Sequence, residues 1–498
     1  MASIARNVVA NWGASLVGAV TGLFIAPLVV RALGSDEYGV WVLVGSLTGP
    51  LSLLDLGVRS AVTRQIARSK AQSDHEASGR TLRAARRLYA ASAGLAVLVT
   101  VLLTATVVSL YKLPEGLIWP ARVSLLLAGS SLAIGLYGGA FGGLLAGVQR
   151  LDLIGMMNIV AELGRIALVA TVLWLEGGIA GLGVVVFVLA LGRLAFQRVM
   201  ARRSYPEAFS PGAPPSPEDY RAIFAISAVS TAIYAFGMLS ANTSVYILGA
   251  LRPLREVGEY SIGTTLPSYL MAFSLPIAQV VLPRSSELAA VGDLHGLRRL
   301  VLQSSRLGTL LLLPVAVGFI TRGGTFLALW MGPEHRGTAE PVLQIFALTC
   351  LMSLPRHVGQ TALIGAGQHR PIVPWYVVEF GLVAVMTYLL TPQWGTVGTA
   401  WSAVVPFAIV ALAGIPALMR QHLGLPWWQG IIQCYVRPLG AMLPFALGCW
   451  WMESTVAATS YVAFFAQMLA VVPLAVAGAW FIGLDADERQ MLIARLRR

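Results

Sequence analysis

Charged residues inside two apolar stretches are the ones whose chemistry matters most in this chain. In residues 144–169, Glu162 and Arg165 lie three positions apart, so they share one face of a helix. Residues 362–385 hold Glu379 at a similar place, and Arg356 lies shortly before them. A charge in a segment long enough to span a membrane is costly and usually has a function. We therefore expect a charged site inside the membrane.

Arginine is well suited to phosphate, because its planar guanidinium can donate to two oxygens at once. Arg165 and Arg356 are predicted near the middle of their spans, and Gln360 lies one turn from Arg356 on the same face. Arg59 and Arg31 would meet an anion at the two ends of the first spans. All five are candidate substrate-binding residues.

A structural role for the same arginines is the alternative. Arg165 would then only neutralise Glu162, and Arg356 would only pair with Glu379, which would lock helices together. Arg31 and Arg59 would reach lipid headgroups instead of a substrate.

The acidic residues are candidates for ion coupling. Glu162 and Glu379 are expected at matching depth, where a carboxylate could carry a proton or bind Na⁺, or could serve only as counter-ion to an arginine. Asp55 is a third candidate, although fixing a helix end or pairing with Arg59 explains it equally well.

Composition predicts the class of protein that must position these charges. The 498 residues are 57% hydrophobic and 12% charged, whereas soluble domains carry about 25% charged residues. Apolar runs of about 20 residues recur throughout, which predicts an all-α polytopic membrane protein. The net charge of +12 does not indicate nucleic acid, because most basic residues fall in short loops. The three cysteines and six histidines are scattered, so we expect no metal and no cofactor.

Fourteen spans are expected, and the Pro-rich segment 204–220 separates two lobes. We predict an N-lobe at 1–203 with helices 1–6, a cytoplasmic linker at 204–220, a C-lobe at 221–420 with helices 7–12, and two further helices with a tail at 421–498. The expected spans are 7–30, 38–58, 88–110, 121–147, 154–175, 178–198, 222–250, 258–283, 307–330, 339–366, 371–391, 395–419, 437–457 and 460–482.

Loop charges predict the orientation of these spans. The even number of spans puts both termini on one side, and the arginines of the inner loops and the tail make that side the cytoplasm. This interpretation assigns Arg193 to an inner loop and Arg322 to an outer one.

An internal repeat supports the two lobes. RALGSDEYGVW at 31–41 and LREVGEYSIG at 254–263 both place an acid and a tyrosine near glycine. Spans 4–5 match spans 10–11 in the same way, so the lobes would be related by an axis along the membrane normal. Chance similarity between apolar sequences is the alternative.

The chain resembles a known family through several short motifs. The set comprises residues 31–34 (RALG), Tyr38-Gly39, residues 54–57 (LDLG), Arg64, residues 258–260 (GEY) and residues 367–370 (GQHR). It is similar to the Wzx-type O-antigen flippases of the multidrug/oligosaccharidyl-lipid/polysaccharide (MOP) superfamily. The resemblance implies a V-shaped, MATE-like, two-lobe transporter of the bacterial inner membrane. Its substrate would be an undecaprenyl-diphosphate-linked oligosaccharide, moved to the periplasmic leaflet by alternating access through a charged central cavity, for lipopolysaccharide or other surface polysaccharide.

Three other functions compete with this one. A cation-coupled multidrug exporter would favour an acidic, aromatic cavity, whereas buried cations are as prominent here as buried acids. A lipid II flippase has nearly the same substrate chemistry. A membrane glycosyltransferase or polymerase would need a large outer loop, and the longest expected here has about ten residues. We therefore expect a transporter and not an enzyme, in contact with membrane lipids, driven by H⁺ or Na⁺ or by removal of product by a downstream polymerase.

Overall fold

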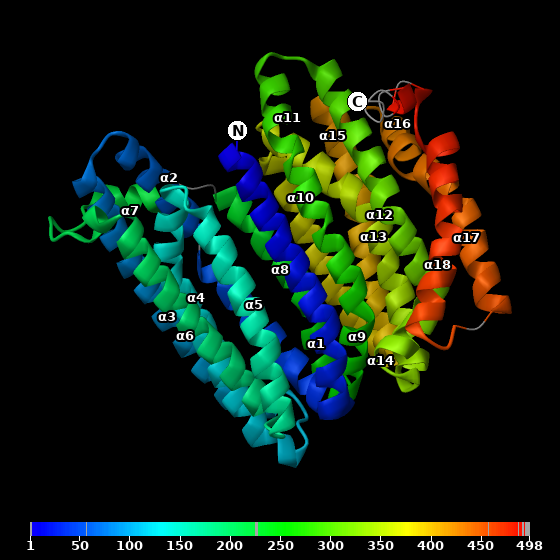
Figure 1. Cartoon of the computed structure of the whole chain (residues 1–498), viewed down its shortest axis with the longest axis horizontal. Coiled ribbons are helices and arrows are strands. Elements are labelled where there is room, and N and C mark those ends of the chain that lie inside the picture. The colour runs from blue at the N-terminus through cyan, green and yellow to red at the C-terminus, as the bar shows by residue number, and fades with distance from the viewer. Residues whose placement is uncertain are drawn as a thin grey trace. The chain divides into compact units, whose positions relative to one another are not determined.

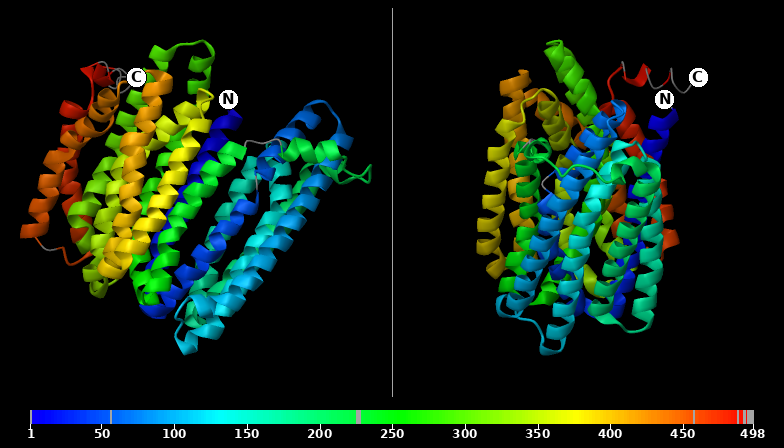
Figure 2. Two further views of the ribbon diagram at one scale, coloured as in Figure 1. Left: turned by 180° about the vertical axis from the view of Figure 1, so that it is seen from behind. Right: turned by 90° about the vertical axis from the view of Figure 1, so that its left-hand side faces the viewer.

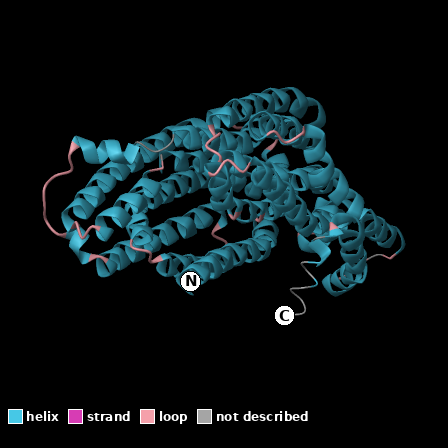
Figure 3. Ribbon diagram, turned by 90° about the horizontal axis from the view of Figure 1, so that it is seen from above, coloured by secondary structure: helices cyan, strands magenta, loops and turns pink. Residues whose placement is uncertain are grey.

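The computed structural model consists almost entirely of helices joined by short loops (Figure 3). It describes residues 2–55, 57–224, 228–456, 458–486, 488–490 and 493, without the side chains of 2–17, 19, 20, 108, 224, 228, 230, 275, 276 and 279. Eleven helical segments of this part are long and apolar enough to cross a membrane. The prediction of an all-α, multi-pass membrane protein is confirmed. Half of the residues after the last predicted span, 483–498, lie outside the described residues.

The chain forms two compact units. Unit 1 comprises Met1–Ala235 and Pro253–Gly258, and unit 2 comprises Phe236–Arg252 and Glu259–Arg498. The division lies beyond the Pro-rich segment at which we expect the domain boundary. That segment is fastened to unit 1, because Arg83 donates to the backbone carbonyls of Ser210 at 3.1 Å and Ala213 at 2.9 Å. It is therefore not a free connector between the units.

Unit 1 is built on a glycine-rich central helix. Its elements are α1 (Ala2–Thr48), η1 (Gly49–Asp55), α2 (Val58–Ala71), α3 (His75–Leu110), η2 (Glu115–Leu117), α4 (Ile118–Gly147), α5 (Leu151–Trp174), α6 (Gly178–Ser204), η3 (Pro206–Phe209), α7 (Pro217–Phe224) and the start of α8 (Ala228–Leu251). Helix α4 packs against α2, α3 and α6, and Figure 1 shows α3, α4 and α6 side by side.

Helix α1 contains the first predicted span and the first half of the second. Gly34, at φ 74°, interrupts its helical backbone, and this left-handed conformation is one that glycine adopts without strain. In Figure 2 the dark-blue start of the chain descends and its continuation rises. The break separates the segments that we expect at 7–30 and 38–58.

Unit 2 contains the remaining helices. They are the rest of α8, α9 (Leu254–Ala272), α10 (Ser274–Gln279), α11 (Val281–Ala290), α12 (Leu294–Trp330), η4 (Pro333–His335), α13 (Arg336–Gly365), η5 (Arg370–Ile372), α14 (Val373–Ile409), η6 (Val410–Gly414), α15 (Ile415–Leu423), α16 (Trp427–Ile431), η7 (Ile432–Val436), α17 (Arg437–Thr455), α18 (Tyr461–Gly478) and η8 (Ala479–Gly483). The first turn of α9 belongs to unit 1.

Helix α14 also turns back on itself. Gly395, at φ 54°, interrupts it, and hydroxyls on the two sides of the break meet. Thr387 contacts Ser402 at 2.7 Å and Thr391 contacts Thr399 at 2.8 Å. The two halves correspond to the predicted spans 371–391 and 395–419. In the described part of the chain, the fourteen predicted spans fall mostly on helical residues, although the second is interrupted by the turn at Gly57 and the eighth is broken at Phe273 and Val280.

Two arginines assigned to loops are in fact inside helices. Arg193 lies well within α6, and Arg322 lies in α12, where it is only 1% exposed. Both loop assignments are wrong, because the loop-charge count included two arginines that fall inside the expected spans 178–198 and 307–330, and the helices α6 and α12 do contain them. In α12, Arg322 contacts Glu453 of α17 at 3.1 Å and Gln467 of α18 at 2.6 Å.

Candidate functional site

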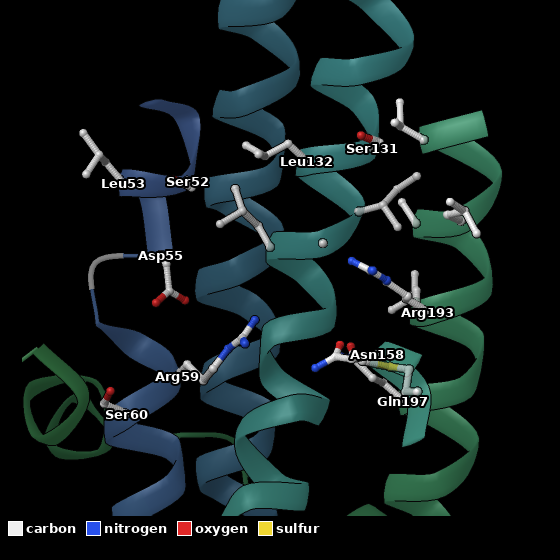
Figure 4. Close-up of a pocket in the computed structure, with 18 of the residues that line it drawn as sticks. Ser52, Leu53, Asp55, Arg59, Ser60, Ser131, Leu132, Asn158, Arg193 and Gln197 are labelled. Atoms are coloured by element: carbon white, nitrogen blue, oxygen red, sulfur yellow. The ribbon is translucent and has the colours of Figure 1, made fainter. Parts of the chain in front are cut away.

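A cavity of about 800 Å³ with several charged side chains in its walls lies within unit 1. Its walls come from η1, α2, α4, α5, α6 and the start of α8. Five charged residues line it, namely Asp55, Arg59, Glu162, Arg165 and Arg193, and Asn158 and Gln197 add amides. Figure 4 shows Arg59 and Arg193 extending toward each other from opposite sides. With three cations and two carboxylates, the cavity has one excess positive charge and suits an anion.

Glu162 joins two of these arginines. One carboxylate oxygen lies 2.8 Å from Arg165 on the same helix, and the other lies 3.5 Å from Arg193 on α6. All three side chains keep contact with solvent, with exposed fractions of 19% for Glu162, 34% for Arg165 and 42% for Arg193. These ion pairs are therefore open to the cavity, and an arriving anion can compete for the arginines.

Glycines of α4 let the part of the cavity wall that carries Asp55 and Arg59 pack closely. A side chain at Gly139 would begin 2.7 Å from the Tyr89 ring, and one at Gly147 would begin 2.8 Å from Ile66 of α2. Because glycine has no side chain, Tyr89 can reach Asp55, to which its hydroxyl donates a hydrogen bond. The missing side chain also lets α2, the helix that carries Arg59, lie close against α4.

A second cavity, of about 360 Å³, lies within unit 2 between α8, α9, α13 and α14. Arg356 donates to both carboxylate oxygens of Glu379, at 3.0 and 2.6 Å. Its guanidinium also lies over the rings of Phe407 at 4.2 Å and Tyr376 at 5.0 Å. The pair is almost fully buried. It is much less accessible to a ligand than the arginines of unit 1.

The structure sorts the predicted site residues into three groups. Four of them line the unit 1 cavity (Asp55, Arg59, Glu162 and Arg165), and two line the unit 2 cavity (Arg356 and Glu379). Of the other two, Gln360 accepts a hydrogen bond from the Tyr376 hydroxyl at 2.6 Å, and Arg31 is exposed on α1 and borders neither cavity. Both ion pairs that we considered as alternatives to substrate binding are present.

Arg193 is the one charged residue in the described lining of this cavity that was not among the predicted site residues. It lies in an apolar run, 183–196, which carries only this one charge. A lone charge in such a run indicates a functional residue inside the membrane, and this pattern could have identified Arg193. Within the described part of the chain, no group of three or more metal-ligating side chains occurs. Arginine and carboxylate side chains thus supply the charge of the unit 1 cavity.

Comparison with known proteins gives a family and a fold. The profile of the family described as "Polysaccharide biosynthesis protein" matches residues 4–289. No curated protein matches the chain. The chain has the fold of MOP superfamily transporters, which confirms the predicted MATE-like architecture.

Three solved structures illustrate that fold. The lipid II flippase MurJ in an inward closed conformation is 9% identical, with a TM-score of 0.72, and the match covers 99% of this chain and 100% of that one. An inward-facing multidrug resistance MATE transporter is 14% identical, with a TM-score of 0.65 and coverage of 81% and 94%. A point mutant of the Vibrio cholerae MATE transporter VcmN is 14% identical, with a TM-score of 0.56 and coverage of 86% and 100%.

Proposed function

Because the chain belongs to the polysaccharide biosynthesis protein family, we propose that it translocates a lipid-diphosphate-linked oligosaccharide across a membrane. The substrate is an undecaprenyl-diphosphate-linked glycan that moves from the cytoplasmic to the periplasmic leaflet of the bacterial inner membrane. Both termini face the cytoplasm, the movement is an alternating-access transport step, and no bond of the substrate is made or broken.

The observation that carries this proposal is the set of three arginines in the unit 1 cavity. A diphosphate cannot enter hydrocarbon without partners for its charge. Guanidinium groups offer several N–H donors in a planar fork that matches phosphate oxygens. Arg59, Arg165 and Arg193 come from three different helices, so they can surround one headgroup, and Asn158 and Gln197 offer hydrogen bonds to sugar hydroxyls.

The charge balance disfavours a cation exporter. A cavity for organic cations would carry excess carboxylates or an exposed aromatic cage. In unit 1 the carboxylates are outnumbered, and Glu162 is already paired with two arginines. A lipid II flippase would use the same diphosphate chemistry, so the identity of the accumulated lipid must separate these two functions.

The test is the sidedness of lipid-linked glycan in cells that lack this protein. We expect the deletion to accumulate a lipid-linked oligosaccharide in the cytoplasmic leaflet, and wild-type protein to clear it. Arg193→Gln is expected to clear it at least tenfold more slowly, because it removes a cavity cation. Arg203→Gln, an exposed arginine on the same helix, is the matched control and is expected to behave as wild type.

Two outcomes would redirect the assignment. Accumulation of lipid II instead of an oligosaccharide lipid would identify the protein as a lipid II flippase. Unchanged sidedness together with sensitivity to cationic drugs would overturn the flippase proposal in favour of an exporter.

A further inference from the structure

We infer that the Glu162 carboxylate competes with the phosphate groups of the substrate for Arg165 and Arg193. Before substrate binds, the Glu162 carboxylate holds Arg165 and Arg193. The arriving diphosphate then displaces it, and Glu162 pairs with the two arginines again when the substrate leaves. The inference rests on the proposed function and adds that Glu162 keeps substrate binding reversible.

The geometry of Glu162 divides its two oxygens between two helices. Arg165 approaches one oxygen at 2.8 Å from α5, and Arg193 approaches the other at 3.5 Å from α6. The contact to Arg193 is longer, so it is the weaker of the two. We expect the phosphate to displace Glu162 from Arg193 first and from Arg165 second.

Both arginines keep donor capacity for a ligand. A guanidinium carries five N–H groups, and the two arginines share a single carboxylate, that of Glu162. The two side chains are 34% and 42% exposed and border the same cavity. A diphosphate can therefore reach them without unfolding a helix, and its several oxygens offer more acceptors than one carboxylate does.

The corresponding acid in unit 2, Glu379, is buried and has a single arginine partner. Glu379 accepts both bonds from a single arginine, Arg356, whose guanidinium lies over the rings of Phe407 and Tyr376. The side chains of Arg356 and Glu379 are only 4% and 7% exposed. That pair is closed, whereas the pairs of Glu162 are open, so exchange of partners is expected in unit 1 alone.

Removal of the Glu162 charge should therefore strengthen binding and slow release. In Glu162→Gln the two arginines lose their partner and are available to the diphosphate at once. Partly exposed ion pairs are weak, so we expect the dissociation constant to fall only about three- to tenfold. Turnover is expected to fall as well, because nothing reclaims the arginines when the substrate leaves.

The experiment titrates the full-length protein in lipid nanodiscs with inorganic pyrophosphate and with geranyl diphosphate. Glu162→Gln is compared with Asp55→Asn, which removes the same charge from the same cavity but releases neither Arg165 nor Arg193. We expect a three- to tenfold tightening for Glu162→Gln and a smaller tightening for Asp55→Asn, which makes the cavity more positive but releases neither Arg165 nor Arg193. The double variant Glu162→Gln/Arg193→Gln is expected to return toward wild-type affinity, because one of the released arginines is gone.

Each outcome decides something. Equal tightening by Asp55→Asn would mean that only the overall potential of the cavity matters, and unchanged or weaker binding by Glu162→Gln would mean that the carboxylate does not compete. Either result overturns the inference while the proposed function stands. If wild-type protein binds neither diphosphate, the phosphate site itself is wrong and both proposals fall. Glu162→Asp, with a shortened side chain, is expected to tighten binding less than Glu162→Gln and serves if the amide variant does not fold.

Discussion

Arg356 donates from both terminal nitrogens to the two carboxylate oxygens of Glu379, and this pair joins α13 to the first half of α14. We expect Arg356→Ala to lower the free energy of unfolding by about 3–5 kcal/mol, because it leaves a buried carboxylate without its cation. Thermal unfolding of the purified protein measures this. The exposed arginine Arg284, which pairs with Glu287 at 2.8 Å, is the control, and Arg284→Ala is expected to change stability by less than about 1 kcal/mol.

A double replacement separates a structural role of this pair from substrate binding. Arg356→Met with Glu379→Leu removes both charges and keeps much of the volume, so it is expected to recover most of the stability that Arg356→Ala loses. If Arg356 only joins helices, the double variant transports glycan at close to the wild-type rate. Loss of transport in a stable double variant would instead place Arg356 or Glu379 in the substrate path.

Arg322 fastens the last two spans to the rest of unit 2. Fully buried, it bonds Glu453 of α17 and Gln467 of α18, and its guanidinium lies 5.1 Å from the Phe464 ring. We expect Arg322→Ala to cost about 3–5 kcal/mol of stability. Gln467→Ala, which removes one neutral partner, is expected to cost about 1 kcal/mol. Thermal unfolding of both variants compares them, and a similarly small effect of the two would show that the cluster does not hold these helices.

Asp485, which follows the last span, gives the protein a pH-dependent contact. Burial alone would raise the pKa of its carboxyl, but the contacts with Arg437 and Arg306 outweigh burial and hold that pKa below its usual range. A lowered pKa in the folded state adds stability that is present above the unfolded pKa of about 3.9 and is lost as the pH falls through the folded value.

The corresponding variant is Asp485→Asn. It is expected to have a lower melting temperature than wild type at pH 6, and the difference should shrink as the pH falls below about 4. Melting curves between pH 3 and pH 7 test this, with Glu287→Gln as a control for an exposed carboxylate. A difference that stays constant across this range would contradict the role assigned to the arginines.

Sequence reasoning predicted the spans because their lengths and apolar content depend only on local composition. It placed Glu162, Arg165, Arg59 and Asp55 in spans or at their ends, and these four line one cavity. It also offered the Arg165–Glu162 and Arg356–Glu379 pairs as alternatives, and both are present.

The sequence could not predict partners that lie far apart in the chain. The contact between Arg193 and Glu162 depends on how α6 packs against α5. The contact of Arg322 with Glu453 joins α12 to α17, across more than a hundred residues. Counting loop charges assigned both arginines to the membrane surface, although the expected spans 178–198 and 307–330 contain them. Their partners depend on tertiary packing.

Gly39 lets α1 lie very close to the first turn of α9. A side-chain carbon at this position would lie 1.9 Å from the backbone oxygen of Leu254, in the first turn of α9, and one at Gly258 would lie 2.7 Å from the oxygen of Ser35. A backbone oxygen cannot rotate away as a side chain can, so Gly39→Ala must push the two helices apart. We expect a loss of about 1–3 kcal/mol of stability. Gly45, farther along the same helix, faces open space, and Gly45→Ala is expected to raise stability by about 0.5–1 kcal/mol through its better helix propensity. Thermal unfolding of the two variants makes the comparison, and equal effects would show that the contact between Gly39 and Leu254 is not close in the folded protein.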